Sequence, residues 1–191
     1  LGIDQTLLAE AFASSAAYFD QPRTEKERWT YIQDINHGYQ GTGDQRLDPS
    51  VAPDLKEAFT MRDIHKNETK PKLWPSPDFL GTASRFFDEA LRGSNIVMEA
   101  FAIALDLPID FFRKCHYGQN VALRYLHYPV MEEEPTEDQI GCGTHTDFGT
   151  ITLLFQDDVG GLQIQGRDGI WRDAAYIPGT IIINTADLVA T

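Results

Sequence analysis

The hydrophobic pattern of this chain changes its period partway along, and this change constrains the fold more than any single residue does. From Phe79 to Leu105 apolar residues recur every three or four positions, which is the spacing of one helix face. After Pro108 the spacing alternates, and from Gly143 onward short apolar runs are separated by glycine turns. Helices followed by strands indicate an α+β protein, and several short, regularly spaced strands favour a sandwich or jelly roll.

Two helices are predicted in the first part of the chain. Residues 4–19 place apolar side chains on one face, and Asp4 is a suitable N-cap. Residues 79–105 continue the helical pattern, but Gly93 and Ser94 interrupt it. One kinked helix and two stacked helices are therefore both possible.

Two further segments are interpreted as loop and one as strand. Residues 34–53 are rich in Gly, Asp and Pro and are predicted to be loop, which makes His37 a loop histidine rather than a metal ligand. Residues 121–128 alternate and are predicted to be a strand that places Arg124 and Tyr128 on the same face. The acidic stretch Met131–Asp138 is expected to be a solvated connection.

The last 50 or so residues are predicted to contain only strands and turns. Each apolar run is short and is followed by Gly-Gly, Gly-Arg-Asp-Gly or Pro-Gly, which are turn sequences. The expected strands are 150–156, 162–165, 170–172 and 180–184, with a hairpin turn at 166–169.

Composition excludes several classes of partner. The formal net charge is −13, whereas phosphate binding requires clustered Lys and Arg, so nucleic acid is not an expected partner. No apolar stretch approaches the roughly 18–20 residues that span a bilayer, and no membrane partner is expected. The two cysteines, Cys115 and Cys142, are expected to be reduced thiols of a cytoplasmic protein. The sequence does not define the oligomeric state.

His145 and Asp147 are the candidate metal ligands. Residues i and i+2 of an extended chain point to the same side, so the two polar groups can converge. Imidazole nitrogen together with carboxylate oxygen suits Fe(II), which takes two histidines and one carboxylate in many oxygenases. By itself the pair decides nothing, because a surface histidine and an aspartate that caps a turn would give the same spacing.

The segment "HTDFGTITLLFQDDVGGLQIQ…GIWRDAAYIPGTIIINTADL" resembles the core of the 2-oxoglutarate- and Fe(II)-dependent dioxygenases of the isopenicillin N synthase-like superfamily. The resemblance includes the His-Thr-Asp pair, "GLQ" after a glycine turn, the "W…PG" strand and the "N…DL" hairpin. Upstream, "LRYLHYP" is similar to the "LR…YYP" strand of that family. The resemblance covers nearly the whole chain.

This resemblance implies a non-haem iron enzyme with a double-stranded β-helix (jelly-roll) core and N-terminal helices packed on it. His145 and Asp147 would ligate Fe(II), and Tyr128 would bind a carboxylate of 2-oxoglutarate, the co-substrate used with O2 to oxidise a small molecule. Leu126 stands where many plant members carry Asn. Phe148, beside the ligand aspartate, is expected to be a packed aromatic.

The resemblance also implies a division of the chain, with residues 1–118 as an N-terminal helical region and 119–191 as the first part of the jelly-roll domain. The distal histidine ligand and the Arg-x-Ser pair of the family have no counterpart up to Thr191, and Leu1 is not Met, so a fragment lacking both ends is expected. Such a fragment would bind iron and 2-oxoglutarate poorly and would be inactive. A same-fold oxidase that does not use 2-oxoglutarate and a non-catalytic jelly-roll binding module remain alternatives.

Overall fold

The computed structural model describes residues 1–45, 53–116, 121–130 and 141–186. The chain divides into two compact units, Leu1–His145 (unit 1) and Thr146–Thr191 (unit 2). The division lies well after the expected boundary at 118/119, because the strand at 122–127 pairs within unit 1. The residues on either side of that boundary, like the acidic stretch Met131–Asp138, are outside the described residues.

Unit 1 contains all of the helices in the described ranges. The first, α1 (Gln5–Phe19), begins as predicted, because the Asp4 carboxylate accepts hydrogen bonds from the backbone N–H of Thr6 at 2.8 Å and of Leu7 at 3.3 Å. The others are α2 (Arg23–Lys26), α3 (Ile64–Asn67), α4 (Pro77–Ala104) and α5 (Phe111–Cys115), with 3-10 turns η1 (Glu27–Trp29), η2 (Gln33–Ile35) and η3 (Pro71–Leu73).

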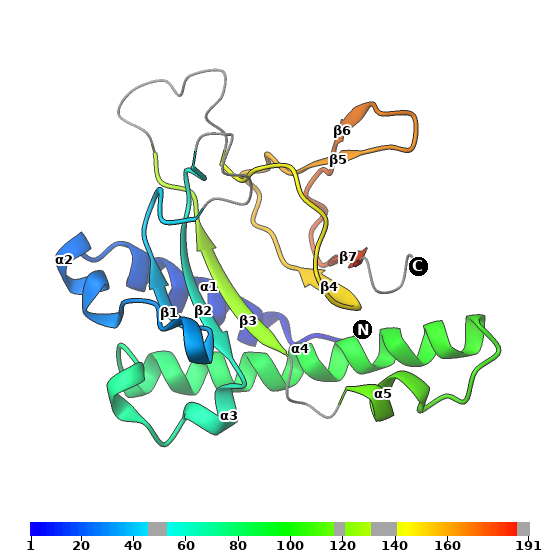
Figure 1. Ribbon diagram of the computed structural model, residues 1–191, viewed down its shortest axis with the longest axis horizontal. Helices are drawn as coiled ribbons and strands as arrows, with labels where there is room; N and C mark the ends of the chain where they lie inside the picture. The colour runs from blue at the N-terminus through cyan, green and yellow to red at the C-terminus, as the bar shows by residue number, and fades with distance from the viewer. Residues whose placement is uncertain (46–52, 117–120, 131–140, 187–191) are drawn as a thin grey trace. The chain divides into compact units, whose positions relative to one another are not determined.

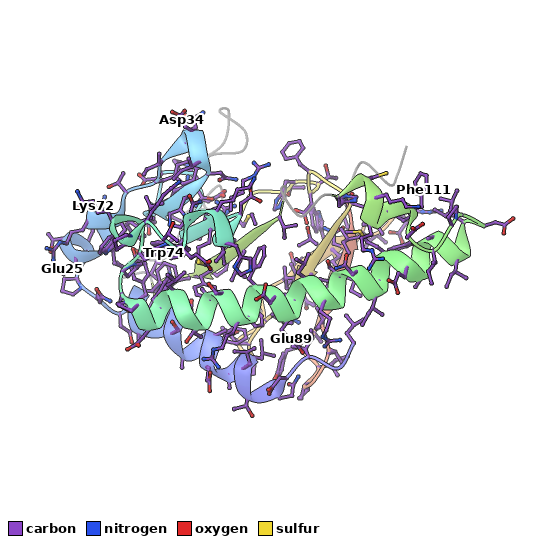
Figure 2. All side chains as sticks on the ribbon, turned by 90° about the horizontal axis from the view of Figure 1, so that it is seen from below. Glu25, Asp34, Lys72, Trp74, Glu89 and Phe111 are labelled. Carbon is purple, nitrogen blue, oxygen red and sulfur yellow. The ribbon has the colours of Figure 1, made fainter. Side chains whose placement is uncertain are left out.

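Helix α4 is one continuous helix of 28 residues, which decides between the two predicted arrangements. It begins at the Ser76 cap, whose hydroxyl accepts a hydrogen bond from the N–H of Phe79 at 3.0 Å. Gly93 does not interrupt it, and a Cβ at that position would lie 3.1 Å from Ile3, so the glycine allows the N-terminal segment to pack closely. Figure 2 shows α1 beside α4, and Glu89 of α4 accepts a hydrogen bond from the N–H of Asp4 at 3.2 Å.

A three-stranded antiparallel sheet packs against these helices in the order β1 (His37–Gln40), β2 (Glu57–Arg62), β3 (Ala122–His127) (Figure 1). The prediction that 34–53 is entirely loop is therefore wrong. His37 is a buried strand residue with 1% of its surface exposed, and its Nε2–H donates to the Leu73 carbonyl at 2.9 Å. A Cβ at Gly38 would lie 2.7 Å from the carbonyl of Trp29, the last residue of η1. Glycine is therefore required where β1 passes the end of η1.

The core of unit 1 is mainly aromatic and lies between the sheet and the helices. Strand β2 is buried on both faces along nearly its whole length, and β1 and β3 pair with its two edges. Trp74, labelled in Figure 2 beside the start of α4, donates from its indole N–H to the Asn67 carbonyl at 2.9 Å. The buried cluster consists of Tyr18, Phe19, Tyr39, Phe59, Met61, Ile64, Trp74, Phe79, Ala83, Phe87 and Tyr125.

Unit 2 contains strands and turns and no helix in its described part, as predicted. Strands β4 (Ile151–Leu154) and β7 (Ile182–Thr185) pair antiparallel, and so do β5 (Gln163–Gln165) and β6 (Trp171–Asp173). The β5–β6 hairpin turns at 166–169, where Gly169 has a φ of +77°. Helices and sheets together confirm the α+β class.

Two smaller expectations concern the thiols and the membrane. Cys115 and Cys142 are both free, as predicted. Among the described residues, no helix combines the length and the apolar character needed to cross a bilayer.

Candidate metal site

Strand β3 presents the predicted alternation. Ala122, Arg124 and Leu126 are exposed on one face, while Tyr125 on the other face is 7% exposed in the aromatic core. The Arg124 guanidinium donates to the side-chain oxygen of Gln40 at 3.3 Å and to that of Gln45. The strand therefore presents one polar side chain, that of Arg124, on the face that is not used by the core.

Tyr128 follows β3 and packs against a glycine of the next described segment. A Cβ at Gly141 would lie 3.0 Å from two carbons of the Tyr128 ring, so the absence of a side chain there makes room for the phenol. Partial burial, together with the nearby Cys142 and Asp54, raises the pKa of Tyr128 to about 12, although Arg124 opposes the shift. The phenol is consequently protonated near neutral pH and can donate a hydrogen bond.

His145 lies at the end of unit 1 and is exposed. Its Nδ1 is 2.7 Å from the Gly143 carbonyl and 3.9 Å from the Cys142 sulfur. Because a carbonyl only accepts, Nδ1 carries the proton in the neutral ring and Nε2 carries the lone pair. A backbone carbonyl on the second ring nitrogen is the arrangement that orients metal-ligating histidines.

The segment that carries His145 is attached to the start of β2 by a buried ion pair. Asp54 accepts a hydrogen bond from the N–H of Gly143 at 2.9 Å, and the Lys56 ammonium donates to the Cys142 sulfur at 2.9 Å. Sequence reasoning missed both charged residues, because "PDLKE" is typical of a solvated loop. A strand start with two charges beside a buried apolar run is the signal that could have indicated them.

Asp147 belongs to unit 2 and is half-buried there. Its Oδ2 accepts a hydrogen bond from the Asn184 amide at 2.9 Å, and Asn184 lies in β7 opposite Thr152 of β4. The strand pair thus supplies the group that orients the carboxylate. Asn184 occurs in the "N…DL" motif, but sequence reasoning gave it no role.

The three predicted site residues therefore lie in two units. Tyr128 and His145 are in unit 1, and each lies near Cys142. Asp147 is the second residue of unit 2. Within the described ranges, no group of three His, Cys, Asp or Glu residues is arranged to hold a metal ion. The expectation that Phe148 is packed is wrong, because 92% of its surface is exposed.

Two family models match the chain. The model described as the 2OG-Fe(II) oxygenase superfamily matches residues 117–191, and the model described as the non-haem dioxygenase in morphine synthesis N-terminal matches residues 1–77. The range matched by the oxygenase model includes all three predicted site residues, Tyr128, His145 and Asp147.

Curated relatives extend the match to nearly the whole chain. A 2-oxoglutarate-Fe(II) type oxidoreductase of Aspergillus fumigatus is 29% identical over 98% of this chain and 61% of its own length. Validamycin A dioxygenase of Streptomyces hygroscopicus subsp. limoneus is 30% identical over 98% of this chain and 56% of its own length. The chain thus spans about three-fifths of the length of such relatives.

Solved structures give the same result. A full-length Neurospora crassa protein in complex with alpha-KG superimposes with a TM-score of 0.84 at 33% identity, covering 100% of this chain and 62% of the Neurospora chain. The complex of the same Neurospora protein with alpha-KG and thymine gives a TM-score of 0.85 at 31% identity, and the match covers 63% of that chain.

Proposed function

Because the chain belongs to the 2OG-Fe(II) oxygenase superfamily, we propose that it acts in the Fe(II)- and 2-oxoglutarate-dependent oxidation of a small organic molecule, by hydroxylation or a related reaction. Named relatives act on small molecules: one is called validamycin A dioxygenase and another homoarginine-6-hydroxylase. The activity belongs to the whole protein, of which the described units would supply the ligand-bearing segment.

The donor chemistry at His145 and Asp147 fits Fe(II), and these two residues would hold the metal. The observation that carries the proposal is the orientation of both side chains: the Gly143 carbonyl accepts from Nδ1 of His145, and the Asn184 amide donates to Oδ2 of Asp147. Nitrogen and oxygen donors with such supporting partners are typical of non-haem iron sites. When bound, Fe(II) and 2-oxoglutarate supply the O2-dependent oxidising chemistry.

Tyr128 would bind a carboxylate of 2-oxoglutarate. A phenol with a pKa of about 12 stays neutral at physiological pH, and it donates to a carboxylate without adding a second negative charge. The Gly141 backbone limits where the ring can lie. Tyr128 and Arg124 would thus add one neutral donor and one cation to the co-substrate side of the site, which suits a dianion.

Three finer assignments accompany this proposal. Strands β3 to β7 would belong to a double-stranded β-helix, which is the fold of the oxygenases that the chain resembles. The free thiols support a cytoplasmic location. The net charge of −13 supports a small molecule rather than a nucleic acid as the substrate.

The experiment is release of labelled CO2 from 2-oxoglutarate by the full, naturally translated chain, loaded anaerobically with Fe(II) and then exposed to O2. We expect Fe(II)-dependent release that is lost in His145→Ala and Asp147→Ala and kept in His65→Ala. His65 is a matched control because it is an exposed histidine of α3 that binds Glu68 and Asp88. No release by the wild type under any substrate mixture would contradict the proposal.

A further inference from the structure

The buried ion pair of Asp54 and Lys56, just before β2, makes hydrogen bonds to other residues besides its own salt bridge. Asp54 and Lys56 are each only 3% exposed, and their side chains form a direct ion pair. Burying two charges costs several kcal/mol of desolvation free energy per ion, so such a pair is weak evidence of a role in stability alone. What else the pair contacts therefore indicates its use.

Within the described residues, the side chains of both partners make further hydrogen bonds to one segment, 86 to 89 residues later in the chain. The carboxylate of Asp54 accepts from the N–H of Gly143, and the ammonium of Lys56 donates to the sulfur of Cys142, both at 2.9 Å. The same Gly143 residue offers its carbonyl to Nδ1 of His145 at 2.7 Å. A chain of contacts thus runs from the buried pair, through the single residue Gly143, to the imidazole.

A second buried ion pair of unit 1, Lys26 with Glu57, makes no hydrogen bond to the described part of the segment that bears His145. Lys26 and Glu57 are 6% and 7% exposed and 2.8 Å apart. Their further hydrogen bonds go to the Phe19 carbonyl, Tyr39 and His127. None of these residues lies in the segment that bears His145, so the two pairs differ in what they hold.

We propose that Asp54 and Lys56 are positioning residues that hold Cys142 and Gly143 and so set the tautomer and orientation of His145 for metal binding. This inference rests on the proposed function. If Gly143 were not held, its carbonyl could turn away and Nδ1–H would lose its partner. The metal would then have to order the segment itself, at a cost in affinity, and partners of this kind typically change metal affinity by about 10–100-fold.

The test is anaerobic titration of the full chain with Co(II), whose absorption reports coordination directly, in the presence of 2-oxoglutarate. The double variant Asp54→Leu/Lys56→Met removes both charges and the acceptor for Gly143, and its Kd should rise by about tenfold or more. Asp54→Asn/Lys56→Met also removes both charges and the contact from Lys56 to Cys142, but its amide oxygen still accepts from Gly143, so its Kd should rise by only about 3–10-fold, less than in Asp54→Leu/Lys56→Met.

The matched control is Lys26→Met/Glu57→Gln, which neutralises the other buried pair and should leave the Co(II) Kd within about threefold of the wild type, whatever it does to the melting temperature. A wild-type Kd for Asp54→Leu/Lys56→Met would overturn the positioning role and leave the proposed function intact. A wild-type chain that binds no Co(II) would contradict the proposed function instead.

If Asp54→Leu/Lys56→Met does not fold, Cys142→Ala provides the test, because it removes the sulfur that accepts from Lys56 and that also lies 3.9 Å from Nδ1 of His145. Its Kd should rise by about 3–10-fold, less than for loss of both contacts. An unchanged Kd in this variant would overturn the role of Lys56, and protection of the Gly143 amide from hydrogen exchange would still test Asp54. Fast exchange of that amide in the folded wild type would overturn the Asp54 contact.

Discussion

Replacing Lys26 with methionine should lower the free energy of unfolding of unit 1 by about 3–5 kcal/mol at pH 7, because it leaves the buried Glu57 carboxylate without its cation. The Lys26 ammonium lies 2.8 Å from both oxygens of Glu57, and the two side chains are 8% and 9% exposed. Water therefore cannot replace the lost hydrogen bonds without opening the core.

The loss should depend on pH in a defined direction. Burial by itself raises the pKa of Glu57, yet hydrogen bonds from Lys26, Tyr39 and His127 hold it below its usual value of 4.5. A lowered folded-state pKa adds stability that is present above pH 4.5 and is lost as the pH falls below it. In Lys26→Met, burial raises the pKa of Glu57 without the opposing hydrogen bond from Lys26, so the unpaired carboxylate takes up a proton at a higher pH than in the wild type. The difference in stability between the two proteins should therefore be largest near pH 7 and shrink as the pH falls to about 4.

The assay is urea unfolding followed by helical ellipticity, since all helices of the described residues lie in unit 1. With a slope of about 2 kcal/mol/M, the midpoint should fall by about 2 M at pH 7. The double variant Lys26→Met/Glu57→Gln should recover much of the loss, because it removes the unpaired charge. A loss under about 1 kcal/mol, or one that does not change between pH 7 and pH 4, would refute the reasoning.

Three further predictions concern the site. Asn184→Ala removes the amide that donates to Asp147 and should weaken Co(II) binding by about 10–100-fold in a spectroscopic titration, whereas Asn95→Ala, at a half-exposed position of α4, should not. Gly141→Ala places a Cβ 3.0 Å from the Tyr128 ring and should raise the Kd for 2-oxoglutarate, measured calorimetrically, with little change in the Kd for Co(II); equal changes in both would count against this placement. Ultraviolet titration of the wild type minus Tyr128→Phe should show a phenol that ionises near pH 12, and a midpoint near 10 would contradict the environment described for Tyr128.

The elements that were predictable from sequence are those whose signal is local. Asp4 caps α1 through bonds that span only two and three residues, and the turn at 166–169 contains its own glycines. Strand β3 alternates because one of its faces is buried. In contrast, β1 and β2 were missed: β1 lies in a Gly- and Asp-rich stretch, and β2 is buried on both faces and shows no alternation.

The candidate site was predictable only in part, for a similar reason. The spacing of His145 and Asp147 is visible in the sequence, but the groups that orient them are distant: Asn184 is 37 residues from Asp147, and Asp54 is 89 residues from Gly143. Only the fold brings such residues together. Phe148 was expected to be packed because aromatic side chains usually are, but its neighbours in the described structure leave it exposed.

The central claim is that His145 and Asp147 hold a ferrous ion, and metal analysis after anaerobic Fe(II) loading and desalting tests it most directly. The full, naturally translated chain should retain about one iron per chain, while His145→Ala and Asp147→Ala should retain almost none and His65→Ala should match the wild type. Equal iron content in the wild type and in the His145 and Asp147 variants would contradict the claim.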